Sequence, residues 1–381
     1  MIYIPLSYVK SDMVLAKDVP APSGLYALLS RGQIMTPGII AKLRLHEIDG
    51  VYVESEISED VVPEHLIEPH ERRRILSDVR TIYNSFFNKR YIQLSDLDSS
   101  KKLAEQLVDT ILERDDILLD VIEIKSYDNY TYSHCLNVSM LSVLIAKQIG
   151  FSHNRLTDIA LCGLMHDIGK IDIPINIINK PGPLSYEEYE LIKTHPQNGL
   201  ERMRKCYNIS REVLSGIQCH HEKYSGGGYP YGYKGESIPL FARILAIADV
   251  YDALTSRRSY RKAWLPCEAI QYIISQSDVL FDPSLVQSFL RTVCAYPTGT
   301  IVELSDGSVA IVSKNHPENV LRPTVRLIEC SDLGTAGTEI NLCEDTSYLN
   351  ITVKSALGAF GDEIRSLPDK IFKHEEADNA I

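Results

Sequence analysis

The segment LFARILAIADVYDALTS, residues 240–256, constrains the fold more than any other part of the sequence. Its apolar residues cover so much of a helix surface that the helix has to be buried. The same segment carries Asp249, and an unpaired carboxylate in an apolar interior is costly. The chain must therefore supply a partner for Asp249 from a distant part of the sequence.

Other predicted helices carry histidine side chains at comparable places. Taken alone, a histidine on an apolar helix is usually a core residue with its hydrogen bonds satisfied, and an adjacent pair can lie on the surface. Histidines and aspartates on five separate helices are hard to explain as independent choices of core residue. The histidines concerned are His134, His166, His195, His220 and His221.

A metal centre explains these side chains together. Imidazole and carboxylate ligands without thiolate suit iron, manganese or a similar ion. Neighbours on a helix diverge by about 100°, so the adjacent pairs His166–Asp167 and His220–His221 can serve two ions, with Asp167 as a bridge. Two ions about 3.5–4 Å apart commonly serve phosphate-ester hydrolysis, because they activate water and stabilise charge on the phosphoryl oxygens. Lys170 can then meet a phosphate oxygen, although a solvated lysine is its simpler interpretation.

The helices themselves are predicted from apolar side chains at helical spacing. Gly150 ends the first of them. Ser185 and Glu188 have the spacing of a capping box, and Pro196 interrupts the helix that they begin. The predicted helices cover residues 137–150, 156–169, 185–195, 211–222 and 240–256, and a charge-alternating helical stretch runs from 69 to about 118.

Both ends of the chain show strand patterns. MVLAKDV and GVYVESE predict strands, and TPGIIAKLRLHEI predicts a short helix with Pro37 in its first turn. Near the other end, TIVELSDGSVAIVSKN predicts two strands joined by an Asp-Gly turn. We therefore predict a mainly α protein with a helical bundle, a small N-terminal α+β module of unknown role and a small C-terminal β unit. The predicted boundaries are 1–68 for the N-terminal module, 69–118 for a helical linker, 119–294 for the bundle, 295–355 for the β unit and 356–381 for a solvated tail.

Charge and cysteine content limit the functional classes. A formal net charge of -12 argues against coating of nucleic acid, which needs a basic face, so we expect neither DNA nor RNA as a partner. The eight cysteines form no C-x-x-C pair and most lie in apolar runs, which indicates reduced thiols rather than a disulfide or zinc framework. No signal peptide or apolar run of membrane-spanning length is evident. We expect a cytoplasmic protein.

Three segments closely resemble the HD-GYP domain, a bacterial branch of the HD phosphohydrolases: MHDIGKIDIPINIINKPGPLSYEEYELIKTHPQNG, CHHEKYSGGGYP and IADVYDALTSRRSYRKA. The resemblance covers roughly residues 125–290, and its motifs occur in the family's order. It implies an HD-type all-helical metal-binding bundle, with residues 119–294 as the HD-GYP catalytic domain. It also implies hydrolysis of cyclic-di-GMP to the linear dinucleotide pGpG, to GMP or to both.

The resemblance also assigns roles to individual residues of this sequence. The implied catalytic residues are Asp167 and Lys170. The implied metal ligands are His134, His166, Asp167, His195, His220, His221 and Asp249. The implied substrate contacts are Lys170, the GYP triplet Gly228, Tyr229 and Pro230, and Asp252, Arg258 and Arg261, of which the arginines can bind phosphate with two hydrogen bonds and stack on bases.

Two positions depart from the family pattern. Some members hold a third metal with a glutamate four residues before the first histidine, where this chain has Tyr130. We therefore expect two divalent ions, iron or manganese, unless Asp128 substitutes for the glutamate. The family's loop carries aspartate or asparagine before its first glycine, and here Ser225 keeps a hydroxyl but loses the charge.

Three functions remain open from the sequence. In the first, a metal-activated hydroxide at the two-metal site attacks one phosphorus of cyclic-di-GMP in line. In the second, the same chemistry acts on another cyclic dinucleotide, such as a GMP-AMP hybrid. In the third, the domain is a non-catalytic sensor that binds cyclic-di-GMP, or a diguanylate cyclase through the GYP loop, and reports to the N-terminal module. The oligomeric state also stays open, with a homodimer among the alternatives.

Overall fold

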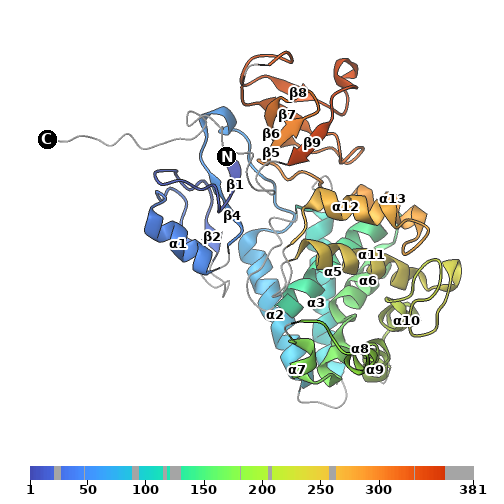
Figure 1. Ribbon diagram of the computed structural model, residues 1–381. Coiled ribbons are helices and arrows are strands. Elements are labelled where there is room, and N and C mark those ends of the chain that lie inside the picture. Colours follow the sequence, from blue (N-terminus) through green and yellow to red (C-terminus); the bar gives the residue numbers. More distant parts are fainter. Residues whose placement is uncertain are drawn as a thin grey trace. The chain divides into compact units, whose positions relative to one another are not determined.

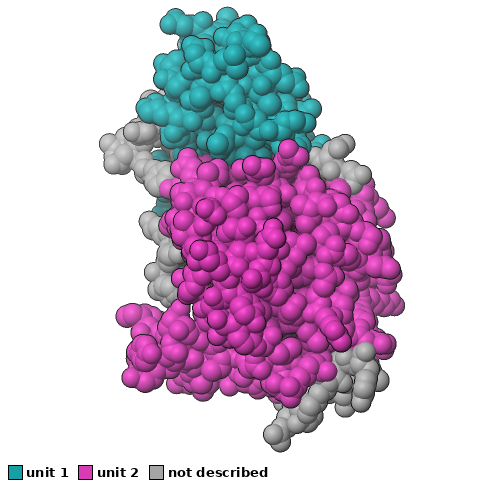
Figure 2. All heavy atoms as spheres, turned by 90° about the vertical axis from the view of Figure 1, so that its right-hand side faces the viewer, with its two compact units in different colours: residues 1–64, 120–128, 294–381 teal, residues 65–119, 129–293 magenta. Residues whose placement is uncertain are grey.

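The chain forms two compact units in the computed structural model (Figure 2). The helical unit comprises residues 65–119 and 129–293, and the terminal unit comprises 1–64, 120–128 and 294–381. The residues that the structure describes are 1–20, 27–46, 48–87, 94–114, 118–120, 130–180, 182–204, 208–256, 263–329 and 331–356.

The helical unit confirms the predicted mainly α fold (Figure 1). Its 3-10 segments are η2 (Ile168–Asp172) and η3 (Gly235–Ser237). Its helices are α2 (Pro69–Phe87), α3 (Leu94–Leu112), α5 (Tyr130–Gln148), α6 (His153–Met165), α7 (Ile175–Ile178), α8 (Tyr186–Ile192), α9 (His195–Met203), α10 (Arg211–Cys219), α11 (Leu240–Thr255), α12 (Pro266–Ser275) and α13 (Pro283–Leu290).

Helix α11, the apolar segment with Asp249, lies in the middle of the packing, as predicted. It packs against α5, α10, α12 and α13, and its Tyr251 and Phe241 are fully buried. Helix α5 in turn packs against α6, and α6 packs against α3 and α10. Helix α9, which carries His195, packs against η2 and α10. These contacts bring together the helices that carry the histidines, although they are far apart in sequence.

Local signals fix where several of these helices begin and end. Ser185 and Glu188 form the predicted capping box, with the Ser185 N–H donating to the Glu188 carboxylate over 2.7 Å. Pro196 interrupts the helical run as predicted, and it does so by lying in the first turn of the next helix, α9. The helix predicted over 156–169 instead ends at Met165, and the chain continues into η2. The HD pair, His166 and Asp167, therefore lies at a change of helix type.

The terminal unit is built from both ends of the chain. The Asp-Gly hairpin is confirmed, because β5 and β6 pair antiparallel around Asp306 and Gly307. In the described residues β5 to β9 form an antiparallel sheet in the order β8-β7-β6-β5-β9, while β1 pairs with β4 and β2 with β3. Its elements are β1 (Ile2–Pro5), β2 (Val19–Pro20), β3 (Ala27–Leu29), α1 (Pro37–Leu45), β4 (Gly50–Val53), η1 (Glu56–Ser58), β5 (Ile301–Leu304), β6 (Val309–Lys314), β7 (Thr324–Leu327), β8 (Glu339–Asn341), η4 (Thr346–Tyr348) and β9 (Val353–Ala356).

The N-terminal and C-terminal pieces of this unit share one apolar core. Ile2 and Ile4 belong to the same buried cluster as Ile301 and Ile311. The Tyr3 N–H donates to the carbonyl of Gly299 over 2.9 Å. The sequence treats these pieces as two modules, whereas in the structure they pack as one.

Among the described helices, none combines the length and the apolar character that crossing a bilayer requires.

Candidate active site

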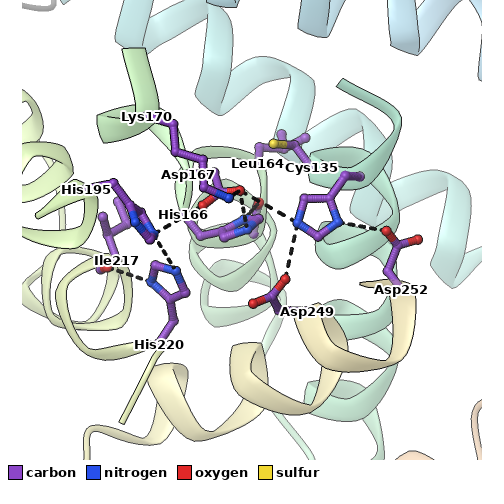
Figure 3. A network of polar contacts seen from close by, with 12 residues as sticks. Cys135, Leu164, His166, Asp167, Lys170, His195, Ile217, His220, Asp249 and Asp252 are labelled. Atoms are coloured by element: carbon purple, nitrogen blue, oxygen red, sulfur yellow. Dashed lines mark hydrogen bonds and ion pairs between the residues drawn. The ribbon is translucent and has the colours of Figure 1, made fainter. Parts of the chain in front are cut away.

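The structure brings the predicted metal ligands into one cluster of mostly buried side chains. Figure 3 labels several of them. They come from the first turns of α5, the junction between α6 and η2, the start of α9, the end of α10 and the middle of α11. Gly169 allows this approach, because a Cβ at its position would overlap the carbonyl of His195. The cluster consists of His134, His166, Asp167, His195, His220, His221 and Asp249.

Among the described residues, the cluster divides into two groups with metal-ligand geometry. In each group the ligand atoms lie within 4.8 Å of one another. Asp249 extends the second group, since its Oδ1 lies 3.2 Å from Nε2 of His134. The first group is His195, His220 and His221, and the second is His134, His166 and Asp167.

Asp167 joins the two groups through its two carboxylate oxygens. Its Oδ1 lies 3.3 Å from Nε2 of His195 in the first group. Its Oδ2 lies 3.4 Å from Nε2 of His166 and 3.7 Å from Nε2 of His134 in the second. A carboxylate placed in this way can bind one ion with each oxygen, which is the arrangement of a bridging ligand.

Main-chain hydrogen bonds fix how several of the rings face the centre. In each case Nδ1 bonds to the carbonyl of the residue three positions earlier, so Nδ1 carries the proton and Nε2 presents a lone pair. The bonds join His166 to Gly163 at 2.8 Å, His195 to Ile192 at 2.7 Å and His220 to Ile217 at 2.8 Å.

The lone pairs of several ligand atoms lie close together, and no hydrogen-bond donor of the described residues lies between them. Nε2 of His195 and Nε2 of His220 are 3.3 Å apart. In the described part of the chain, the buried Nε2 of His166 and Oδ1 of Asp167 make no hydrogen bond. Buried polar atoms normally find a partner, and a cation held by each group would supply one to the atoms of that group. The donor set therefore fits divalent metal ions that prefer imidazole and carboxylate ligands.

Burial keeps the first group ready to bind a metal. It lowers the pKa of His195 to about 4 and that of His221 to about 3. It also holds the pKa of His220 well below its ordinary value. These imidazoles are neutral at neutral pH, so an ion does not have to displace protons from them.

His134 lies in a more negative environment. Burial by itself lowers its pKa, but hydrogen bonds to Asp249 and Asp252 outweigh burial and raise the pKa to about 10. The same two carboxylates that favour a positive charge on this ring would favour a metal ion beside it. Only 16% of the Asp249 side chain is exposed, so this negative charge is held largely away from water.

Asp252, implied by the resemblance as a substrate contact, occupies a different place in the structure. It is fully buried. Its Oδ2 accepts from Nδ1 of His134 over 2.7 Å, and its Oδ1 accepts from Nδ2 of Asn137 over 2.6 Å. Asn137 was not predicted as a site residue from the sequence, although its position three residues after His134 on one helix places the two side chains on the same face.

Lys170 is a partly exposed neighbour of Asp167. Its Nζ is 2.5 Å from Oδ2 of Asp167, and 34% of its side chain is exposed. Burial works to raise the pKa of Asp167, but the positive charge of Lys170 and the contact with His166 hold that pKa well below its usual range. Asp167 is therefore a carboxylate at neutral pH, and it forms an ion pair with Lys170.

The GYP loop packs directly on His221. The Tyr229 N–H donates to the carbonyl of His221 over 3.2 Å, and the two rings stack with centroids 4.8 Å apart. A Cβ at Gly228 would lie 2.6 Å from that same carbonyl oxygen, so only glycine fits there. Pro230 follows as an exposed residue.

An aromatic surface that the sequence analysis missed continues from Tyr229. Nζ of Lys193 lies 5.7 Å from the centre of the Tyr229 ring and 5.1 Å from that of Tyr189. Tyr189 and Lys193 are four residues apart, a spacing that places two side chains on one face of a helix. That spacing is the signal by which the sequence could have indicated the pair.

Some predicted positions fall outside the described residues. Arg258, Arg261 and Asp128 are among them. Tyr130 begins α5, but its side chain is not described, so the expectation of two rather than three ions stays a prediction.

Comparison with known proteins finds relatives of the part of the chain that carries these residues. A family model described as an HD domain matches residues 119–285. Cyclic di-GMP phosphodiesterase PA4108 of Pseudomonas aeruginosa is 34% identical over 267 residues, which are 67% of this chain and 64% of that protein. Residues 119–285 form an HD domain.

Two further proteins extend the comparison of this HD domain. Cyclic di-GMP phosphodiesterase response regulator RpfG of Xanthomonas campestris pv. campestris is 41% identical over 165 residues, 43% of this chain and 44% of that protein. The solved structure of Bd1817, an HDG"Y"P protein of Bdellovibrio bacteriovorus, superposes with a TM-score of 0.50 at 19% identity and covers 76% of this chain and 97% of that one. That likeness concerns the fold, and it agrees with the predicted HD-type bundle. The chain spans less than two thirds of the length of PA4108 and of RpfG.

Proposed function

We propose that this chain is a metal-dependent phosphodiesterase that hydrolyses cyclic-di-GMP to pGpG, to GMP or to both. The observation that carries the proposal is the position of Asp167, whose two oxygens face two separate groups of imidazole nitrogens. Two ions bridged by a carboxylate are a common arrangement for hydrolysis of phosphate esters. Relatives named cyclic di-GMP phosphodiesterases support the choice of substrate.

The proposed metal ligands are the seven residues of the cluster, and the proposed metals are iron or manganese. Ions held there would activate water and take up negative charge from the phosphoryl oxygens. Lys170, partly exposed and next to Asp167, would bind a phosphoryl oxygen and orient the phosphorus. Asp252 would hold the ring of His134 in place rather than contact the substrate.

The loop and α8 offer a surface for the bases of a dinucleotide. Tyr229 presents its ring beside His221, and Tyr189 and Lys193 extend that surface. Stacking of a nucleobase on an aromatic side chain contributes about 1–3 kcal/mol. We therefore propose that one guanine lies against the Tyr229 and Tyr189 side of the site while its phosphate meets Lys170.

The test is turnover by the full chain, purified without oxygen and loaded with Fe²⁺ or Mn²⁺. Chromatography of the products separates pGpG from GMP. We expect linear product with the native chain and none with Asp167→Asn. Asp158→Asn, which removes the same charge from the helix that precedes the HD pair, is the matched control and should keep its turnover.

Competing outcomes of this test identify the alternatives. A chain that prefers a GMP-AMP hybrid in a competition assay would be a phosphodiesterase for another cyclic dinucleotide. Calorimetric binding of cyclic-di-GMP without product, with metal bound, would make the domain a sensor and overturn the proposal.

The cellular setting of this activity is also a proposal. Buried free thiols at Cys135, Cys162 and Cys219 support a reducing compartment such as the cytoplasm. Binding of a diguanylate cyclase through the GYP loop and formation of a homodimer are further predictions. Co-purification and the mass of the particle in solution would test them.

A further inference from the structure

Helix α2 carries a buried arginine that the sequence had placed in a helical linker. Arg72 is 8% exposed, whereas its neighbours Arg73 and Arg74 are exposed. A buried guanidinium is retained only where it has partners. Its partners lie on α5, the helix that carries His134.

An unbroken series of hydrogen bonds leads from this arginine to the candidate metal site. Nη2 of Arg72 donates to Oδ1 of Asn137 over 2.7 Å. Nδ2 of Asn137 donates to Oδ1 of Asp252 over 2.6 Å. Oδ2 of Asp252 then meets Nδ1 of His134 at 2.7 Å, and Nε2 of that ring lies 3.2 Å from Asp249.

The chemistry of these groups fixes the direction of every bond in the series. A guanidinium only donates and a carboxylate only accepts, whereas the amide of Asn137 can do either and can be turned around. With Arg72 on one side, the amide oxygen has to face Arg72 and the amide nitrogen has to face Asp252. Asp252 is thereby satisfied on one oxygen and accepts from His134 with the other, which leaves Nε2 of His134 to face the centre.

Helix α2 makes a second contact with the site through Tyr83. The Tyr83 hydroxyl donates to the carbonyl of Leu164 over 2.8 Å and lies 3.1 Å from Sγ of Cys135. Leu164 is two residues before His166, and Cys135 follows His134. One helix therefore contacts both segments that supply the second group of ligands.

We propose that Arg72 is a positioning residue for the metal group of His134, His166 and Asp167. It acts through Asn137 and Asp252, which orient His134, and Tyr83 contacts the segments that carry His134 and His166. The inference rests on the proposed metal site but not on its substrate. Helix α2 thus acts as part of the active site, although no residue of it reaches the centre.

The test measures Mn²⁺ binding to the full chain, following free Mn²⁺ by electron paramagnetic resonance. Substitution of a residue behind a metal ligand typically costs 10–100-fold in metal affinity. We expect Arg72→Met to weaken one of two Mn²⁺ sites by about tenfold and to leave the other unchanged. Arg72→Lys, which keeps a group that only donates, should restore most of the affinity.

Two controls separate positioning from a general loss of stability. Arg73→Ala removes the same charge from the exposed side of the same helix and should leave both affinities unchanged. Arg72→Met combined with Asp252→Asn should bind no more weakly than Asp252→Asn alone, because both residues act through one series of bonds.

The outcomes that overturn the inference are distinct from failure of the proposed activity. The inference is overturned if Arg72→Met weakens both Mn²⁺ sites equally or leaves both affinities unchanged. It is also overturned if the fold-losses in Mn²⁺ affinity of Arg72→Met and Asp252→Asn multiply in the double variant. A native chain that takes up no Mn²⁺ would overturn the metal site and the inference with it. A chain that binds Mn²⁺ as expected but does not hydrolyse cyclic-di-GMP would leave the inference standing and remove the proposed activity.

Discussion

Nε2 of His195 and Nε2 of His220 face each other across 3.3 Å, while Nδ1 of each ring bonds to a main-chain carbonyl. Two neutral imidazoles held in this way present two lone pairs to the same point. The two lone pairs repel each other. A hydrogen bond between the rings cannot remove that repulsion, because the only N–H of each ring already donates to a main-chain carbonyl. The arrangement is favourable when a cation lies between them, and this relationship underlies the first prediction.

The number of ions bound should depend on which ligand is removed. We expect two ions per chain in the native protein and one in His220→Ala, which disrupts only the first group. Asp167→Asn should lose both, since Asp167 faces both groups. Elemental analysis after desalting measures the counts. His153→Ala, an exposed histidine paired with Asp109, should keep two ions, and an Asp167→Asn chain that also kept two would contradict a bridging role.

Gly228→Ala should impair the site far more than Gly227→Ala. At Gly228 a Cβ would lie 2.5 Å from Cα of Glu222 and 2.6 Å from the carbonyl oxygen of His221, so the segment carrying the ligand has to move. A displaced catalytic group can cost about 100-fold in turnover. At Gly227 the space is open and only the positive φ of 76° is unfavourable, which costs about 1–2 kcal/mol of stability. Turnover and thermal unfolding of both variants test the contrast, and similar turnover losses would argue against it.

Acid should weaken the terminal unit through Asp60. Hydrogen bonding to Arg326 lowers the pKa of Asp60 from 3.8 to about 2. Because the folded pKa is depressed, the stabilisation is present above the unfolded pKa near 4 and is lost as the pH falls towards 2. Asp60 is 69% exposed, so the effect is small, about 0.5 kcal/mol.

Thermal unfolding of the native chain and Asp60→Asn between pH 5 and pH 2 would detect this loss. The difference between the two proteins should shrink as the pH falls. A difference that stayed constant with pH would mean that the ion pair does not stabilise the fold.

Ser225→Asp should leave turnover unchanged. The Ser225 side chain is exposed, and its main-chain N–H already donates to the carbonyl of Val279 over 2.9 Å. The loop is therefore held at this position by the main chain, without help from a carboxylate. A rise in turnover with cyclic-di-GMP would instead show that the native loop is a weakened form of the family's.

The helices of the site could be predicted because their signals are local. Apolar spacing indicated α10 and α11, and the capping box of Ser185 appears as predicted. Residues on the same face of one helix, such as His134 and Asn137, which both bond to Asp252, were also within reach of sequence reasoning. What stayed hidden was the pairing between distant segments, since nothing near Tyr3 indicates that it meets Gly299.

Arg72 shows why a residue near the site can escape sequence analysis. It lies in the charged run ERRR, and a run of charged residues usually indicates a solvated helix face. Its helical spacing indicates burial instead, because Arg72 lies on the buried side of α2 with Ile75, Val79 and Ile82. A charged residue in the apolar phase of a helix has to be matched by a buried partner, and here the partner is Asn137.

The terminal unit has a consequence for the integrity of the whole chain. Its core joins residues such as Ile2 and Ile301, which lie on either side of the helical unit in sequence. A single protease cut within residues 129–293 would leave two fragments that each keep one part of that shared core. The fragments should stay associated and elute together under native conditions. The terminal unit therefore holds the two fragments of a cleaved chain together without a covalent bond.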